Sequence, residues 1–215
     1  MANKPSGLLS VPSPKNGKNT LSFILPRQLQ ESNILPCHRL DKETSGIMIF
    51  ARGKKARDKM FELFKNHEII KIYIAFIHGI PQKKSGTISS KISEKTAITK
   101  YKTRKILENF SILGIQTVTG RRNQIRIHFK LIKHPLVGER KFAFGKDFKL
   151  KFKRCALHAS RIEFKHPYSG RNLTIEVPLP EDMSKFLEKQ KLKMKSNKEN
   201  NIPQRHKERK GRLKN

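Results

Sequence analysis

Cysteine, acidic side chains and long apolar segments are all scarce in this sequence of 215 residues. The two cysteines, Cys37 and Cys155, form no C-x-x-C pair, and the first residues lack the pattern of a signal peptide. We therefore expect a reduced, cytoplasmic protein. A tetrahedral zinc site draws on three or four clustered ligands. His38 beside Cys37 and His158 near Cys155 are too few, so we expect no metal.

The scarcity of acidic residues leaves a large positive charge. There are 48 Lys and Arg against 17 Asp and Glu, a net charge of +31. Residues 184–215 hold twelve Lys and Arg against three Glu, or +9, which leaves +22 on residues 1–183. A Lys-rich solvated surface is one explanation, but an excess of this size indicates a polyanionic partner. No apolar run approaches the roughly 20 residues of a membrane-spanning helix, so nucleic acid is the better prediction and a membrane is not expected.

Apolar periodicity predicts the secondary structure between residues 19 and 177. The predicted elements are a short helix within 19–32, a buried strand at 47–50, an amphipathic helix at 54–66, a strand at 70–76, two or three antiparallel strands within 86–119, and a hairpin over 157–177. In the strand at 70–76 we assign Ile70, Ile72, Ile74 and Phe76 to the main apolar face and Tyr73 to the other. Residues 123–133 fit both a strand and a helix, and periodicity alone does not decide between them.

The C-terminal segment differs in composition from the rest of the chain. Beyond about residue 183 the sequence is polar, rich in lysine and nearly free of aromatic residues. Such a segment buries too little surface to offset the entropy of ordering. We therefore predict one domain over residues 1–183, followed over 184–215 by a frayed helix that passes into a basic, disordered tail.

The most informative segment is His38-Arg39-Leu40-Asp41-x-x-Thr44-Ser45-Gly46, in a loop that leads into the buried strand. From its neighbours alone, Asp41 is more readily explained as a loop cap or an ion-pair partner than as a nucleophile. Arg39 would be a phosphate clamp or a surface ion pair. Tyr73 would be a half-buried aromatic residue with its hydroxyl in water, and Arg121 one more arginine of a basic patch.

The same segment resembles the central signature of the RluA-type pseudouridine synthases, a family that isomerises uridine in ribosomal and transfer RNA. The resemblance continues in register from about residue 3 to 182. Its further motifs are Asn3-Lys4-Pro5-Ser6-Gly7, Lys71-x-Tyr73-x-Ala75 with Gly79, Gly120-Arg121-x-x-Gln124-Ile125-Arg126-x-His128, Pro135-Leu136-Val137-Gly138, Leu157-His158-Ala159, and His166-Pro167 with Pro178-Leu179-Pro180.

The resemblance implies an α+β fold, in which a mixed, mostly antiparallel β-sheet is flanked by helices and loops around a central active-site cleft. It favours a helix that begins near Asn123. The chain starts at the opening motif, so we expect the strand that usually precedes this motif to be missing from the domain at 1–183. We also expect no S4-like RNA-binding module.

The resemblance also assigns roles. Asp41 would be a nucleophile that attacks ribose C1′ of a flipped uridine or, alternatively, C6 of uracil, without a metal or redox cofactor. Arg39 would fill the gap left by the flipped nucleotide. Tyr73 would stack on the base and is a candidate for removing the C5 proton, while Arg121 would be held against Asp41 and lower its pKa. The remaining substrate-binding candidates are His38, Thr44, Gln124, Arg126 and Leu157.

We thus expect a monomeric enzyme that acts on ribosomal or transfer RNA. The main alternative is a basic RNA-binding protein without catalysis, which the joint presence of Arg39, Asp41, Tyr73 and Arg121 argues against. A nuclease or zinc deaminase would need clustered carboxylates or an H-x-E and P-C-x-x-C pattern, and neither occurs. Two departures from the usual motifs are Arg122-Asn123, where Thr-His is common, and Glu139, where Asp is usual.

Overall fold

The computed structural model describes residues 1–14, 17–143 and 150–200. The chain divides into two units, residues 1–180 and the segment from Glu181 onward. The described part of the second unit is the helix α4 (Glu181–Asn200). Residues 184–200 of the predicted tail lie in this helix, and residues 201–215 lie outside the described residues. The predicted disorder of the tail therefore stays a prediction.

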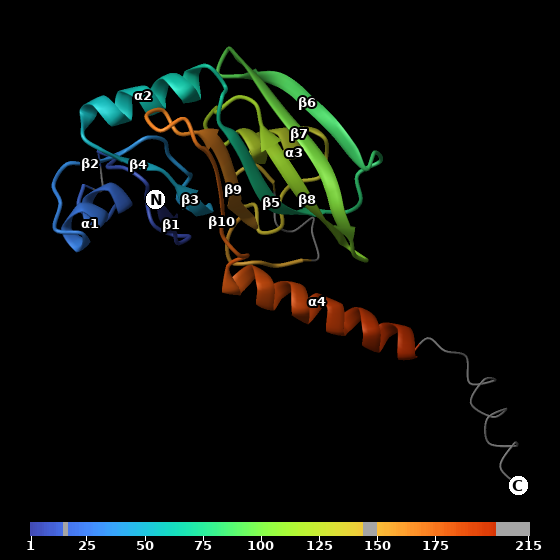
Figure 1. Ribbon diagram of the computed structural model, residues 1–215. Coiled ribbons are helices and arrows are strands. Elements are labelled where there is room, and N and C mark those ends of the chain that lie inside the picture. The colour runs from blue at the N-terminus through green and yellow to red at the C-terminus, as the bar shows by residue number, and fades with distance from the viewer. Residues whose placement is uncertain (15–16, 144–149, 201–215) are drawn as a thin grey trace, which may run out of the picture. The chain divides into compact units, whose positions relative to one another are not determined.

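Within the described residues, the first unit is built on one eight-stranded sheet and a small pair of strands. Along the main sheet the order is β1 (Ala2–Lys4), β3 (Ser45–Met48), β9 (Leu157–Lys165), β5 (Ile70–His78), β8 (Phe110–Thr117), β7 (Lys95–Ile106) and β6 (Ser85–Ile92) (Figure 1). The eighth strand, β10 (Asn172–Glu176), pairs with β9. The small pair consists of β2 (Ile34–Pro36) and β4 (Phe50–Arg52). The β3–β9 pair is parallel and the others are antiparallel. The predicted mixed, mostly antiparallel sheet of an α+β fold is confirmed.

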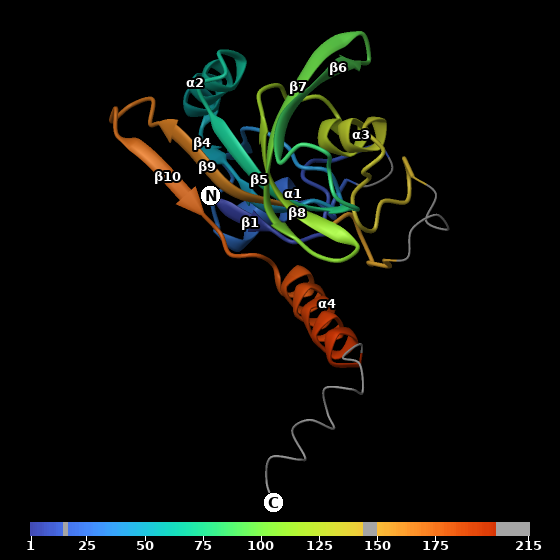
Figure 2. The same cartoon turned by 90° about the vertical axis from the view of Figure 1, so that its right-hand side faces the viewer.

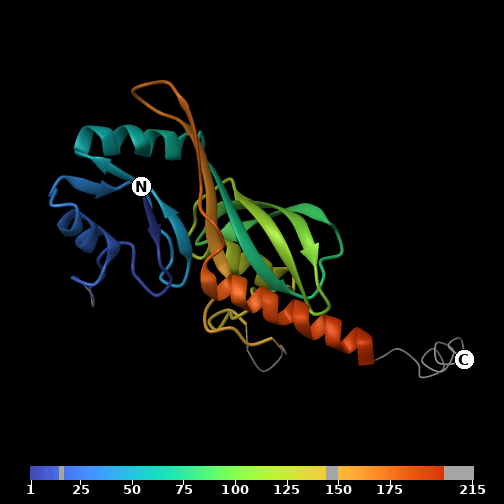
Figure 3. The same cartoon turned by 60° about the horizontal axis from the view of Figure 1, so that its bottom comes forward.

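Three helices of the first unit lie where the sequence predicts them: α1 (Leu21–Gln28), α2 (Lys54–Lys65) and α3 (Gln124–Leu131). The ambiguity at 123–133 is resolved as a helix, which follows Asn123 in a left-handed conformation with φ of 54°. Asparagine tolerates this conformation better than most residues do. Figure 2 shows α3 against β6 and β7, and Figure 3 shows α1 and α2 on either side of the β2–β4 pair.

Every residue of β3 is buried, and the strand contributes to a core on each face of the main sheet. Met48 belongs to a core that α3 covers, together with Ala75, Ile77 and Phe129. Its neighbour Ile47 belongs to a second core beside α2. Successive side chains of a strand point to opposite faces, so this short strand links the two cores.

The predicted orientation of β5 is wrong. Ile70 is 39% exposed, whereas Tyr73 is only 9% exposed and lies with Ala75 and Ile77 in the core under α3. Alternation separates the two faces of a strand but does not say which one a helix covers. Here α3 covers the face with the tyrosine, and Tyr73 is more deeply buried than we predicted.

Gly46 allows β3 and β9 to approach closely. Its φ is +117°, and a Cβ at this position would lie 2.2 Å from the carbonyl oxygen of Ala159. Only glycine adopts such a conformation without strain. The close approach brings the loop that carries Asp41 beside Leu157, the first residue of β9.

Three histidines should make the fold sensitive to acid. Burial lowers the pKa of His38 to about 3, that of His78 to about 4, and that of His128 below its usual value. As the pH falls below about 6.5, the unfolded chain takes up protons that the folded chain does not. The free energy of unfolding should therefore fall towards about pH 4, by up to about 1.4 kcal/mol per pH unit for each histidine.

Urea unfolding at several pH values measures this slope. His128 is the best position for a control, because it is fully buried and neither ring nitrogen has a hydrogen-bond partner among the described residues. In the His128→Leu variant, the slope of the unfolding free energy against pH should be smaller by about the contribution of one histidine. An unfolding free energy that does not change between about pH 7 and about pH 5 would contradict the prediction.

Candidate active site

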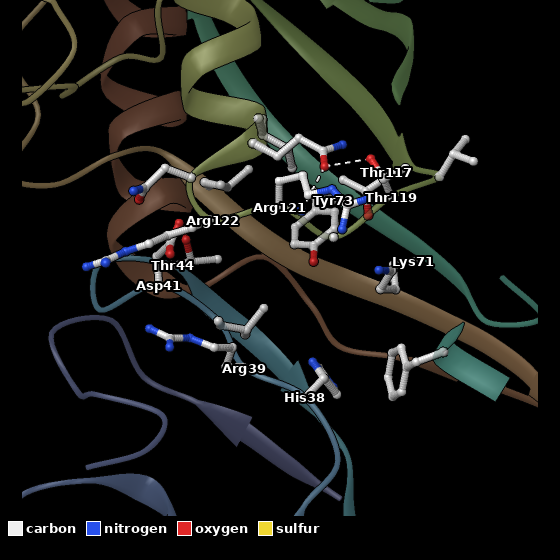
Figure 4. A pocket seen from close by; sticks show the side chains of 18 of the residues that line it. His38, Arg39, Asp41, Thr44, Lys71, Tyr73, Thr117, Thr119, Arg121 and Arg122 are labelled. Atoms are coloured by element: carbon white, nitrogen blue, oxygen red, sulfur yellow. Dashed lines mark hydrogen bonds between the residues drawn. The ribbon is translucent and has the colours of Figure 1, made fainter. Parts of the chain in front are cut away.

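A cavity of about 670 Å³ opens where the loop with Asp41 meets β5, α3 and the segment between β8 and α3 (Figure 4). All nine predicted site residues line it: His38, Arg39, Asp41, Thr44, Tyr73, Arg121, Gln124, Arg126 and Leu157. They come from elements that are far apart in the sequence. The fold thus places the separate motifs around one cavity.

Asp41 lies half-buried in a turn, in which the backbone N–H of Thr44 donates to the carbonyl of Asp41 at 3.1 Å. No hydrogen bond or ion pair to its carboxylate occurs among the described residues. Burial raises its pKa above the ordinary value, against the opposing effect of Arg126, Arg39, Arg122 and Lys4, in decreasing order. The sequence had suggested a lowered pKa, but desolvation outweighs the nearby cations. A carboxylate without hydrogen-bond donors keeps its electron pairs available for attack.

Arg126 is the cation with the largest effect on Asp41. Its guanidinium donates two hydrogen bonds to the carboxylate of Glu139, with Nε–Oε2 and Nη2–Oε1 distances of 2.7 Å each. This pair is nearly dry, because the side chain of Arg126 is 10% exposed and that of Glu139 is 1% exposed. The arginine that we predicted to bind substrate is thus occupied by a buried, bidentate ion pair, and it acts on Asp41 through its charge.

Arg121 does not reach Asp41 in the structure. Its Nε donates to the carbonyl of Thr96 at 3.1 Å, so the predicted pairing with Asp41 is not seen. The left-handed Asn123 turns the chain before α3 begins, and the side chains that precede it leave in different directions. Figure 4 shows Arg122 extending towards Asp41 and Arg121 lying on the side of Thr119.

Two further candidates are held by the protein itself. The amide of Gln124 accepts from Thr119 Oγ1 at 2.7 Å and from the N–H of Arg121 at 2.9 Å, and its Nε2 donates to Ile98 O and Thr99 Oγ1 at 3.0 Å each. Nε2 of His38 accepts the N–H of Ile49 at 3.0 Å. These polar atoms shape the cavity wall instead of facing a ligand.

Of the other predicted residues, Arg39 and Tyr73 present their side chains to the cavity (Figure 4). Arg39 is exposed on the same loop as Asp41, and Figure 4 shows both side chains at one side of the cavity. Tyr73 presents its ring to the cavity, and burial together with the charge of Asp41 raises its pKa to about 12. Thr44 and Leu157 are almost completely buried and form part of the cavity wall.

Sequence reasoning missed two of the cations that act on Asp41, Arg122 and Lys4. Lys4 is completely buried, and its Nζ donates to the carbonyls of Pro5, Leu8 and Lys42 at 2.9, 2.7 and 3.2 Å. Burial, with a smaller effect of Arg154, lowers its pKa to about 8. Its place in the opening motif was visible in the sequence, but its bond to the residue after Asp41 was not.

Within the part of the chain that the structure describes, no three His, Cys, Asp or Glu side chains are close enough to hold a metal ion. The described helices include none that is long and apolar enough to cross a membrane.

The sequence is similar to known RNA-modifying enzymes. A family model described as RNA pseudouridylate synthase matches residues 1–131. An uncharacterized RNA pseudouridine synthase of Bacillus subtilis is 30% identical, over 87% of this chain and 68% of the relative. Ribosomal large subunit pseudouridine synthase D of Buchnera aphidicola is 32% identical, over 86% of this chain and 68% of the relative. Synthase C of Rickettsia felis is 31% identical, over 83% and 64%. The chain thus spans about two thirds of the length of these relatives.

Solved structures share the fold. Human RNA pseudouridylate synthase domain containing 4 superposes with a TM-score of 0.72 at 21% identity, over 88% of each chain. The human domain-containing protein 1 gives 0.66 at 23% identity, over 82% of this chain and 78% of the other. With the family match and the sequence relatives, the assignment is clear: the chain belongs to the RluA-type family and is an RNA pseudouridine synthase, an isomerase.

Proposed function

We propose that this enzyme isomerises a uridine of large-subunit ribosomal RNA, with Asp41 as the nucleophile and the target nucleotide flipped into the cavity. The observation that carries the proposal is the half-buried Asp41 carboxylate, which accepts no hydrogen bond among the described residues and lies near four cationic side chains. Such a carboxylate is available to a substrate, and the cations around it suit the phosphates of RNA.

In the proposed reaction an oxygen of Asp41 attacks ribose C1′. The C1′–N1 bond breaks, and its electron pair leaves with uracil. The detached ring turns, C5 attacks C1′, and the ester bond breaks to return the Asp41 carboxylate. The C5 proton is lost and N1 gains a proton. Atoms and electrons therefore balance without a metal or a redox partner. Attack on C6 of uracil remains the alternative.

Flipping gives Arg39 and Tyr73 their proposed roles. Extruding a base costs a few kcal/mol, and we assign to the exposed Arg39 the role of occupying the gap in the RNA. Tyr73 presents an aromatic ring to the cavity, on which the flipped base would stack. Its pKa of about 12 keeps the phenol protonated near neutral pH, so stacking is the role that we assign to it in the resting complex.

Ribosomal RNA is proposed because two of the relatives described above are ribosomal large subunit synthases. Transfer RNA is the second candidate. The charge of +22 on residues 1–183 suits either RNA. We propose that these residues form the catalytic domain and that residues 184–215 add RNA affinity; a monomeric, cytoplasmic enzyme remains an expectation.

Tritium release from RNA labelled at uridine C5 tests the activity, with Asp41→Ala as the control. No release above that control from any cellular RNA would refute the catalytic proposal. Mapping pseudouridines in cells with and without the protein tests the substrate. A site that is lost from transfer RNA, with ribosomal sites unchanged, would overturn the ribosomal assignment.

A further inference from the structure

The cavity extends beyond the residues that the proposed chemistry uses. One side holds Asp41 and Thr44, and the other is lined by Phe64 of α2 and by Lys71 at the start of β5. Figure 4 shows Asp41 and Lys71 on opposite sides of the cavity, with the ring of Tyr73 between them. This second side has room for a part of the substrate other than the target base.

The charge of Lys71 is not neutralised by any acidic side chain among the described residues. Its ammonium group has no ion pair or hydrogen bond among the described residues, although the side chain is half-buried. Burial lowers its pKa, which reflects the cost of holding this charge away from water. An anionic ligand at Nζ would offset that cost, and RNA offers a phosphate for each nucleotide.

Phe64 supplies an aromatic surface beside this charge. It lies in the last turn of α2, half-exposed, with its ring centroid 5.0 Å from that of His38 and 5.7 Å from Nζ of Lys71. Aromatic rings next to cations bind single-stranded nucleic acid, because each base can stack on the ring while the cation holds the backbone.

The spacing along β5 fits one nucleotide. Lys71 and Tyr73 are two positions apart on this strand, which corresponds to about 7 Å. One nucleotide of an extended RNA strand can span this distance. If the target base stacks on Tyr73, the phosphate of its neighbour can reach Lys71.

We propose that Phe64 and Lys71 form a subsite for the nucleotide adjacent to the target uridine, with the neighbouring base stacked on Phe64 and its phosphate bound by Lys71. The inference rests on the proposed function, because it takes the side with Asp41 as the place of the target. The subsite would make the enzyme read a single-stranded segment around its target and not the uridine alone.

Binding of a short, fluorescein-labelled oligouridylate to the full chain tests the subsite without requiring catalysis. Fluorescence anisotropy at several salt concentrations gives Kd and its salt dependence. Lys71→Met should weaken binding and reduce the slope of log Kd against log salt by about 0.7, the value for one phosphate contact on a single strand. Lys71→Arg should retain the slope.

The aromatic half of the subsite has its own variants. Phe64→Leu should weaken binding about ten-fold with an unchanged salt slope, and Phe64→Tyr should retain affinity. Lys54→Met is the matched control for charge, because Lys54 is exposed at the other end of α2, about 15 Å along the helix from Phe64. It should leave Kd within about two-fold and change the slope less than Lys71→Met does.

A second measurement separates binding from chemistry. In single-turnover tritium release, Lys71→Met should raise the RNA concentration for half-maximal rate but leave the saturating rate within about three-fold. Unchanged affinity and slope would overturn the subsite. So would a lower saturating rate at unchanged affinity, which would place Lys71 in the chemistry. If the wild-type chain releases no tritium, the proposed function fails, and the binding experiment still decides on the subsite.

Discussion

Asp41→Asn should lower the rate of isomerisation by at least about 10⁴-fold, a loss typical of removing a nucleophile. The amide keeps the shape of the carboxylate but lacks its negative charge and cannot form the ester with ribose. The variant should bind RNA as tightly as the wild type or more tightly, because one negative charge is removed from among Arg126, Arg39, Arg122 and Lys4.

Single-turnover tritium release and anisotropy measure the two quantities separately. Asp58→Asn is the matched control, since it makes the same chemical change at an exposed aspartate of α2 that pairs with Arg57. This control should retain full activity. If Asp41→Asn kept more than about 1% of the wild-type rate, covalent attack by Asp41 would be refuted.

The dependence on pH follows from the environment of Asp41. Burial raises its pKa, and only the ionised carboxylate is a nucleophile. The acidic limb of the pH–rate profile should therefore lie above the range of an ordinary aspartate. The nearby cations limit this shift, so removing one of them should move the limb further towards high pH.

The location of the site could be predicted from the sequence because each motif is a short local segment, although the motifs lie far apart in the chain. The segment from His38 to Gly46 fixes Asp41 in a turn before a strand, and Gly46 sets the approach of β3 to β9. The order of the motifs then identified the family. All nine predicted residues line one cavity for this reason.

The direction of individual side chains could not be predicted. Arg121, Arg122 and Arg126 lie within six positions, and which of them faces Asp41 depends on the backbone at Asn123 and on where α3 begins. The orientation of β5 depends on which face α3 covers. The sign of the Asp41 pKa shift depends on burial against charge, a balance that only the assembled cavity determines.

The polar roles of Gln124 and His38 show the same limit. Both belong to motifs of the family, and both line the cavity. Apart from the bond between Gln124 and the N–H of Arg121, their hydrogen bonds go to residues that the motifs do not contain: Thr119, Ile98, Thr99 and Ile49. The motifs thus identified residues that line the site. They did not distinguish residues that face the ligand from residues whose polar groups are bonded within the cavity wall.

Arg126→Met should have the second large effect, on both stability and rate. It leaves the carboxylate of Glu139, with 1% of its side chain exposed, buried without a cationic partner among the described residues. Breaking a buried ion pair from one side costs about 3–5 kcal/mol of unfolding free energy. Loss of the guanidinium also raises the pKa of Asp41 further, so the rate near neutral pH should fall about ten- to hundred-fold and recover in part as the pH is raised.

The double variant Arg126→Met/Glu139→Gln separates the two effects. Oε1 of Glu139 also accepts the backbone N–H groups of Lys141 and Phe142 at 2.8 and 3.2 Å, and the amide oxygen of glutamine can keep these bonds. Without a buried charge, the double variant should regain most of the stability lost in Arg126→Met. It should not regain the rate, because Asp41 still lacks its main cation.

Urea unfolding and single-turnover rates across pH check both statements. Arg161→Met is the control, because the ion pairs of Arg161 with Glu163 and Glu176 are partly or fully open to solvent and should contribute little. A double variant with the wild-type rate at neutral pH would show that Arg126 does not act on Asp41. A double variant as unstable as Arg126→Met would show that packing, and not the unpaired carboxylate, causes the loss. If both expectations hold, Glu139 acts on the reaction only through the arginine that it holds in place.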